Sequence, residues 1–75
     1  MSKAYWLRVY NAQNTLVFER FWNELTDLEK NVLKKSIDHL KDDLNAHRYQ
    51  ILEYDVVADE TIQDFIERME EEKKK

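Results

Sequence analysis

Residues 4–22 carry the clearest structural signal in the chain and read AYWLRVY at 4–10, NAQN at 11–14 and TLVFERFW at 15–22. Both outer runs are rich in aromatic and β-branched side chains, which favour strands, and the polar tetrapeptide between them is typical of a turn. The chain has no glycine, and asparagine tolerates a left-handed backbone better than other non-glycine residues. We therefore expect a β-hairpin in which Asn11 or Asn14 takes a positive φ.

The faces of this hairpin depend on its register. With an even number of loop residues centred on Ala12-Gln13, the better core face pairs Val9 with Leu16, Leu7 with Phe18 and Tyr5 with Arg20. The opposite face then mixes large aromatic and charged side chains, among them Trp6, Arg8, Tyr10, Val17, Glu19 and Phe21. An odd loop would exchange the faces of one strand, so the choice of core face stays open at this point.

A helix is expected over residues 26–44. Thr26-Asp27-Leu28-Glu29 matches the capping box, in which the threonine hydroxyl and the glutamate side chain satisfy free amides of the first turn. Apolar residues then recur at three- and four-residue spacings, at Leu25, Leu28, Val32, Leu33, Ile37, Leu40 and Leu44. Asn45 is expected to end the helix in the left-handed position usually given to glycine.

The remaining sequence predicts one more strand and one more helix. In residues 48–57, Leu52, Tyr54 and Val56 alternate with Ile51, Glu53 and Asp55, and the side with the charges is expected to face water. Asp59 is the expected N-cap of a helix whose apolar stripe is Ile62, Phe65, Ile66 and Met69.

These elements give the order ββαβα in a single domain, residues 1–75, whose charged tail at about 71–75 is expected to fray. The predicted class is α+β: a three-stranded antiparallel sheet in the order 2-1-3 with two helices packed on one face. No predicted element is left to cover the other face.

Composition narrows the classes of function. The 75 residues contain no glycine, proline or cysteine and carry 12 Lys+Arg against 16 Asp+Glu, a formal net charge of −4. This composition excludes P-loops, dinucleotide fingerprints, disulfides and Cys-ligated zinc. Neither a bilayer-spanning run nor a signal-peptide run is present, so we expect a cytoplasmic protein with no membrane partner.

Few residues suggest chemistry. His39, Asp43 and His47 would share one edge of a continuous helix, but the expected helix end at Asn45 breaks that edge. We expect two exposed histidines, one of them paired with Asp43, and no metal site. The acidic pairs (Asp42-Asp43, and Glu53 with Asp55) and the serines (Ser2 and Ser36) have no neighbours that point to catalysis. The expected protein is not an enzyme and uses no cofactor.

The aromatic face of the hairpin is the favoured functional surface. Trp, Tyr and Arg dominate protein-binding hot spots, and a large uncovered aromatic face is rare on a monomer. We expect the main contact with a protein partner to consist of Trp6, Arg8, Tyr10, Val17 and Phe21. A homodimer is expected, because a second copy would cover this face and add burial that so short a chain lacks, although a foreign partner would do equally well.

Two other interpretations of these aromatics stay open. The same residues resemble the stacking platforms of single-stranded nucleic-acid binders, but direct nucleic-acid binding is disfavoured by the acidic balance of the chain. The aromatics would instead be core if the faces of the sheet were reversed.

The acidic C-terminal helix suggests a second mechanism. Its carboxylates could compete with DNA for a basic protein surface, or they could simply be its solvated side. The residues of this acidic decoy surface are Asp59, Glu60, Asp64, Glu67, Glu70 and Glu71. On this alternative, the chain would be a DNA mimic that blocks a basic nucleic-acid-binding protein.

We therefore expect a small non-enzymatic protein-binding module that modulates or inhibits another protein. In its size, its lack of catalytic residues and its combination of aromatic face and acidic helix, the chain is similar in general character to small phage-encoded viral proteins that bind and inhibit host factors. This likeness is compositional, and no family motif carries it.

Overall fold

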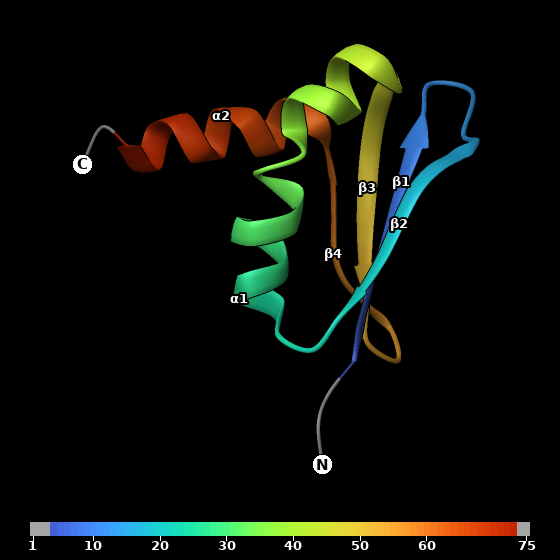
Figure 1. The fold of residues 1–75 in the computed structure, drawn as a ribbon, viewed down its shortest axis with the longest axis vertical. Coiled ribbons are helices and arrows are strands. Elements are labelled where there is room, and N and C mark those ends of the chain that lie inside the picture. The colour runs from blue at the N-terminus through green and yellow to red at the C-terminus, as the bar shows by residue number, and fades with distance from the viewer. Residues whose placement is uncertain (1–3, 74–75) are drawn as a thin grey trace.

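The computed structural model describes residues 4–73 as a four-stranded antiparallel sheet with helices on one side of it (Figure 1). The strands are β1 (Tyr5–Asn11), β2 (Leu16–Trp22), β3 (Ala46–Leu52) and β4 (Val56–Thr61), in the order β2-β1-β3-β4. The helical elements are α1 (Leu25–Asp27), η1 (Leu28–Leu33), η2 (His39–Asp43) and α2 (Ile62–Lys73). The predicted α+β class is confirmed, whereas the three-stranded sheet is wrong because a fourth strand follows the third.

The β1–β2 hairpin forms where the sequence predicts it. Asn14 has a φ of 64°, so asparagine does take the left-handed turn position. The side-chain oxygen of Asn11 accepts hydrogen bonds from the backbone amides of Gln13 (3.0 Å) and Thr15 (2.9 Å). Asparagine thus closes this turn both through its backbone freedom and through its side chain.

The register of the hairpin differs from the expected one by two residues. Val9 pairs with Phe18, not with Leu16, and Tyr5 pairs with Trp22. A bulge between Val9 and Tyr10 leaves Val17 unpaired in β2 and pairs Leu16 with Tyr10, so Leu16, which was expected on the core face, lies on the other face. Because side chains alternate with a period of two, a shift of two residues keeps both predicted faces of β1.

The run predicted as one strand over residues 48–57 folds into parts of two. The chain turns at residues 53–55, where the amide of Glu53 donates to the carbonyl of Asp55 (3.1 Å), and it returns as β4. Pairing with β4 satisfies the outer hydrogen-bonding edge of β3. The predicted faces of this run are also wrong, since Ile51 is fully buried and Tyr54 is 94% exposed.

The fourth strand sets where α2 begins, because α2 follows β4 directly in the chain. Asp59, the expected N-cap, lies inside β4. The hydroxyl of Thr61 instead accepts a hydrogen bond from the amide of Asp64 (3.1 Å), which satisfies a free donor of the first turn. The helix extends to Lys73, so residues 71–73 of the tail expected to fray are helical, and residues 74–75 lie outside the described residues.

The long helix predicted over residues 26–44 is replaced by a bent helical segment. Its first turn begins at Leu25, and Glu24 at the N-cap makes no side-chain capping bond, so the predicted Thr26 capping box is wrong. Asp27 takes over the polar contacts at this end: it accepts hydrogen bonds from the indole of Trp22 (2.6 Å) and from the side chain of Asn31. This contact ties the end of β2 to the start of the helical segment.

Much of the segment has the wider winding of a π-helix. The amide of Lys34 donates to the carbonyl of Glu29 (2.9 Å), a spacing of five residues. This winding suits Leu28 and Leu33, which are five residues apart and both fully buried. The predicted end at Asn45 is confirmed by its φ of 54°.

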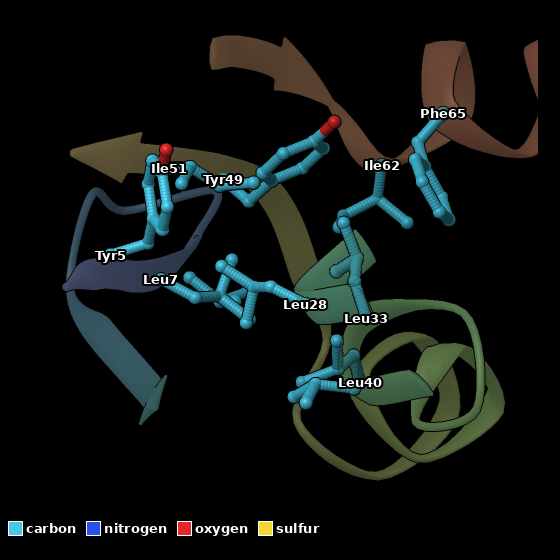
Figure 2. Packing of buried hydrophobic residues seen from close by; sticks show 11 residues of the cluster. Tyr5, Leu7, Leu28, Leu33, Leu40, Tyr49, Ile51, Ile62 and Phe65 are labelled. Carbon is cyan, nitrogen blue, oxygen red and sulfur yellow. The ribbon is translucent and has the colours of Figure 1, made fainter. Parts of the chain in front are cut away.

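The core lies between one sheet face and the helical elements (Figure 2). From the strands it receives Tyr5, Leu7, Val9, Tyr49 and Ile51, and from the helices Leu28, Val32, Leu33, Leu40, Ile62 and Phe65. Tyr49 and Phe65 meet edge to face with ring centroids 5.7 Å apart. Within residues 4–73, none of the helices combines the length and the apolar character that a membrane span requires.

Candidate functional site

The second face of the sheet, here called the open face, points away from the helices. The helical elements pack on the opposite face, and no element of residues 4–73 covers this one. Residues that are directly paired across antiparallel strands project to the same side, so the strand register arranges the open face in three rows across the sheet.

The first row is apolar across all four strands. It consists of Phe21, Trp6, Leu52 and Val56, each paired with the next. The Trp6 and Phe21 rings stack with centroids 5.5 Å apart and planes 10° from parallel. Phe21 is 66% exposed and Val56 49% exposed, so this apolar row remains in contact with solvent at both ends.

The second row is charged and consists of Glu19, Arg8, Gln50 and Asp59. Glu19 accepts a hydrogen bond from the Trp6 indole (3.0 Å), and Asp59 accepts one from Gln50 (3.2 Å). The guanidinium of Arg8 lies over the Trp6 ring, 4.6 Å from its centroid. Each carboxylate of this row is therefore engaged by a hydrogen-bond donor.

The third row consists of Leu16, Tyr10, Arg48 and Thr61. Tyr10 is only 9% exposed, and two guanidinium groups lie over its ring, with Arg8 at 5.3 Å and Arg48 at 5.8 Å from the centroid. Arg48 also reaches back to the second row and binds both carboxylate oxygens of Asp59, at 2.9 and 3.0 Å.

Four of the five residues predicted as the partner contact lie together on this face. Trp6, Arg8, Tyr10 and Phe21 form one connected cluster through the ring stack and the cation–π contacts. Val17 does not join them, since it lies at the β2 bulge and packs against the core cluster. The bulge therefore removes one expected member of the contact.

The other half of the open face was not found from the sequence. Leu52 and Val56 complete the apolar row, and Arg48 and Asp59 form the ion pair beside it. These residues were missed because residues 53–55 carry no glycine or proline to signal a turn. Val56 and Val57 ahead of a polar run were the available signal for a separate strand.

The six carboxylates predicted as an acidic decoy surface do not form one surface. Asp59 lies on the open face, where it is paired with Arg48, and Glu60, the next residue of the same strand, takes part in an internal ion-pair network. The remaining four are exposed on α2: Asp64, Glu67, Glu70 and Glu71.

Glu60 belongs to a polar network on the helix side of the sheet. Arg68 of α2 binds Glu29 of η1 and Glu60 of β4, each at 2.6 Å. The buried hydroxyl of Tyr49 donates a hydrogen bond to Glu60. Burial, followed by the bond to Glu60, raises the pKa of Tyr49 well above its usual range, and the bonds to Glu60 and Glu29 raise the pKa of Arg68 despite its partial burial.

The candidate catalytic and metal-ligating residues do not gather. His39 is bound to Asp43 (2.7 Å), as expected for one of the histidines, while His47 lies on β3 and is exposed. Across residues 4–73, no three His, Cys, Asp or Glu side chains are placed to share a metal ion. Ser2 lies outside the described residues.

No protein-family model, curated protein or solved structure matches the chain. Any functional conclusion therefore depends on the geometry of the open face and on the charges around it.

Proposed function

We propose that this chain is a small non-enzymatic module that binds another protein through its open face. The observation that carries the proposal is the apolar row, Phe21–Trp6–Leu52–Val56, which crosses the whole sheet and is left uncovered by residues 4–73. Burial of exposed apolar and aromatic area is the main driving force of protein association.

The residues around this row support a protein contact. Trp6, Tyr10 and Arg8 are of the types most enriched in binding hot spots. Their mutual stacking holds the side chains in place before binding, which lowers the entropy lost on association. By occupying a partner's surface in this way, the chain would modulate or inhibit that partner, as a phage-type inhibitor of a host factor would.

The alternatives receive less support. A single-stranded nucleic acid would stack on Trp6 and Phe21, but those two rings already stack on each other, and Glu19 and Asp59 would repel a phosphate backbone. An acidic decoy would have to work with the exposed carboxylates of α2 alone, which are Asp64, Glu67, Glu70, Glu71 and Glu72. The homodimer stays a prediction, which the solution mass measured across concentrations tests.

The proposal is tested by site-specific crosslinking in a lysate of the source organism. A photoreactive phenylalanine analogue at position 21 should yield a discrete crosslinked protein, whereas the same analogue at Glu71 on α2 should not. The product should be lost in a Trp6→Ala variant whose circular dichroism matches that of the parent.

The decisive control is the double variant Trp6→Ala/Phe21→Ala. If it stays folded and its association with the crosslinked protein, measured by pull-down, is unchanged, Trp6 and Phe21 do not form the contact. Equal crosslinking from position 71 would likewise contradict the proposal.

A further inference from the structure

The open face carries a cation that no residue of the described range 4–73 binds in an ion pair. Arg8 forms no salt bridge and no side-chain hydrogen bond with residues 4–73, and its Nε is a buried polar atom left without a partner. The two carboxylates of the same row bind other donors, since Glu19 accepts from the Trp6 indole and Asp59 binds Arg48. A buried donor without a partner costs free energy.

The surroundings of Arg8 favour a flat, charged acceptor. Trp6 and Tyr10 hold its guanidinium by their ring faces, at 4.6 and 5.3 Å. Stacking leaves the edge of a guanidinium as its hydrogen-bonding side, and a carboxylate matches the geometry of that edge. Arg8 is therefore suited to receive an aspartate or glutamate from outside.

The apolar row beside Arg8 defines the shape of the occupant. Four paired strands place its ends about 14 Å apart, and the charged row lies about 7 Å away along the strands. An α-helix laid across the strands would cover 14 Å with about nine residues, and its width of about 10 Å would bring one flank over the charged row. Such a helix would place an apolar stripe on the apolar row and an acidic residue at the edge of that stripe beside Arg8.

Two symmetric arrangements of a second copy fit this face poorly. A two-fold axis along the charged row would place Arg8 on its own symmetry mate, and a two-fold axis along the strands would place Glu19 opposite Asp59. Like charges brought together in this way oppose association. A nucleic acid is also disfavoured, because a repeating phosphate chain would meet two carboxylates for each unpaired arginine.

Building on the proposed function, we infer that the partner presents an amphipathic helix whose apolar stripe lies on Phe21–Trp6–Leu52–Val56 and whose flanking carboxylate binds Arg8. This assigns Arg8 as the residue that selects an acidic partner, and the apolar row as the surface that supplies most of the buried area.

The test uses a pair of synthetic helical peptides and the full chain. Both peptides carry leucines at i, i+3, i+4 and i+7, and they differ only in a Glu or a Gln at the edge of the stripe. The Glu peptide should bind about tenfold more tightly by calorimetry, as a charge-assisted bond replaces a neutral one. In Arg8→Gln, the two peptides should bind equally, whereas Arg20→Gln, on the other side of β2, should preserve the difference.

Each other outcome would overturn the inference. Equal binding of the Glu and Gln peptides to the unmodified chain would do so without any variant, so a fold defect in Arg8→Gln cannot hide the result. Tighter binding of oligo-dT than of the Glu peptide, or an Arg8-dependent dimer in sedimentation, would assign the face to nucleic acid or to a second copy. A position-21 crosslink alongside equal peptide binding would retain the protein-binding proposal and reject only the acidic helix.

Discussion

At the scale of single residues, Tyr49 links the core to the polar network. Its ring is buried against Phe65, while its hydroxyl donates to the carboxylate of Glu60. Burial and the adjacent carboxylate both disfavour the tyrosinate, so the pKa of Tyr49 is raised in the folded protein. A substitution of Tyr49 therefore removes its hydrogen bond to Glu60, its apolar contacts with the core, or both.

The raised pKa of Tyr49 predicts a loss of stability in alkali. An unfolded tyrosine releases its proton near pH 10, whereas folded Tyr49 keeps it, so the free energy of unfolding should be unaffected by this group at lower pH and should fall as the pH rises above about 10. Urea denaturation from pH 8 to 11 should show a weaker fall in Tyr49→Phe. Tyr54→Phe, at a 94% exposed position, is the matched control and should keep the parental slope. The same slope in Tyr49→Phe and the parent would contradict the argument.

At the scale of elements, the junctions depend on asparagine and on a bent helical segment. Asn14 and Asn45, at φ of 64° and 54°, close the hairpin and join η2 to β3. Between them, Asp27 binds the indole of Trp22 and so fixes where the segment leaves the sheet. The π-type winding then brings Leu28 and Leu33 to the same buried side.

The junction at Asn45 predicts an ordered series of variants. A left-handed backbone costs a residue with a Cβ about 1–2 kcal/mol, and asparagine and glycine avoid much of this cost. Asn45→Ala should therefore lower the free energy of unfolding by about 1 kcal/mol, while Asn45→Gly should change it little. Asn23→Ala, at an exposed position without a positive φ, is the control, and chemical denaturation ranks the four proteins. Equal free energies of unfolding for Asn45→Ala and Asn45→Gly would mean that the left-handed backbone at this junction does not affect stability.

At the scale of the whole molecule, Arg68 joins three elements of the fold. From α2 it binds Glu29 in the first helical segment and Glu60 at the sheet edge. Because α2 follows directly after an edge strand and leads away from the sheet, this network supplements the packing of Ile62 and Phe65 that holds the helix in place (Figure 1). A short chain with a small core gains from such ties between elements.

Substitution of Arg68 should lower the free energy of unfolding more than substitution of a surface arginine. Arg68→Met leaves Glu29 and Glu60 near each other without a cation, and since all three are only partly buried we expect a loss of about 1–2 kcal/mol. Adding Glu60→Gln to Arg68→Met should recover part of the lost free energy of unfolding. The control Arg20→Met, at an exposed position, should change stability by less than about 0.5 kcal/mol in the same denaturation experiment. Equal losses in the two arginine variants would mean that the network contributes nothing measurable.

Local signals were enough for part of this fold. Residue type and spacing predict the hairpin, the asparagine at each left-handed position, and the aromatic face with Trp6, Arg8 and Tyr10. They do so because turn chemistry and side-chain alternation act over a few residues. The split between β3 and β4 did not follow, since residues 53–55 turn without glycine or proline and Asp59 resembles a helix cap.

Local sequence alone establishes the α+β class, the location of the hairpin and which side chains of β1 face away from the core. These features depend on local backbone preference and on side-chain alternation with a period of two. Tertiary structure decided the register, the fourth strand and the winding of the helical segment. Those features depend on how distant strands satisfy each other's backbone hydrogen bonds and on which apolar residues fit one shared core. The apolar row beside Arg8 crosses the whole sheet only once β4 is in place, since β4 supplies Val56 and also the Asp59 that pairs with Arg48.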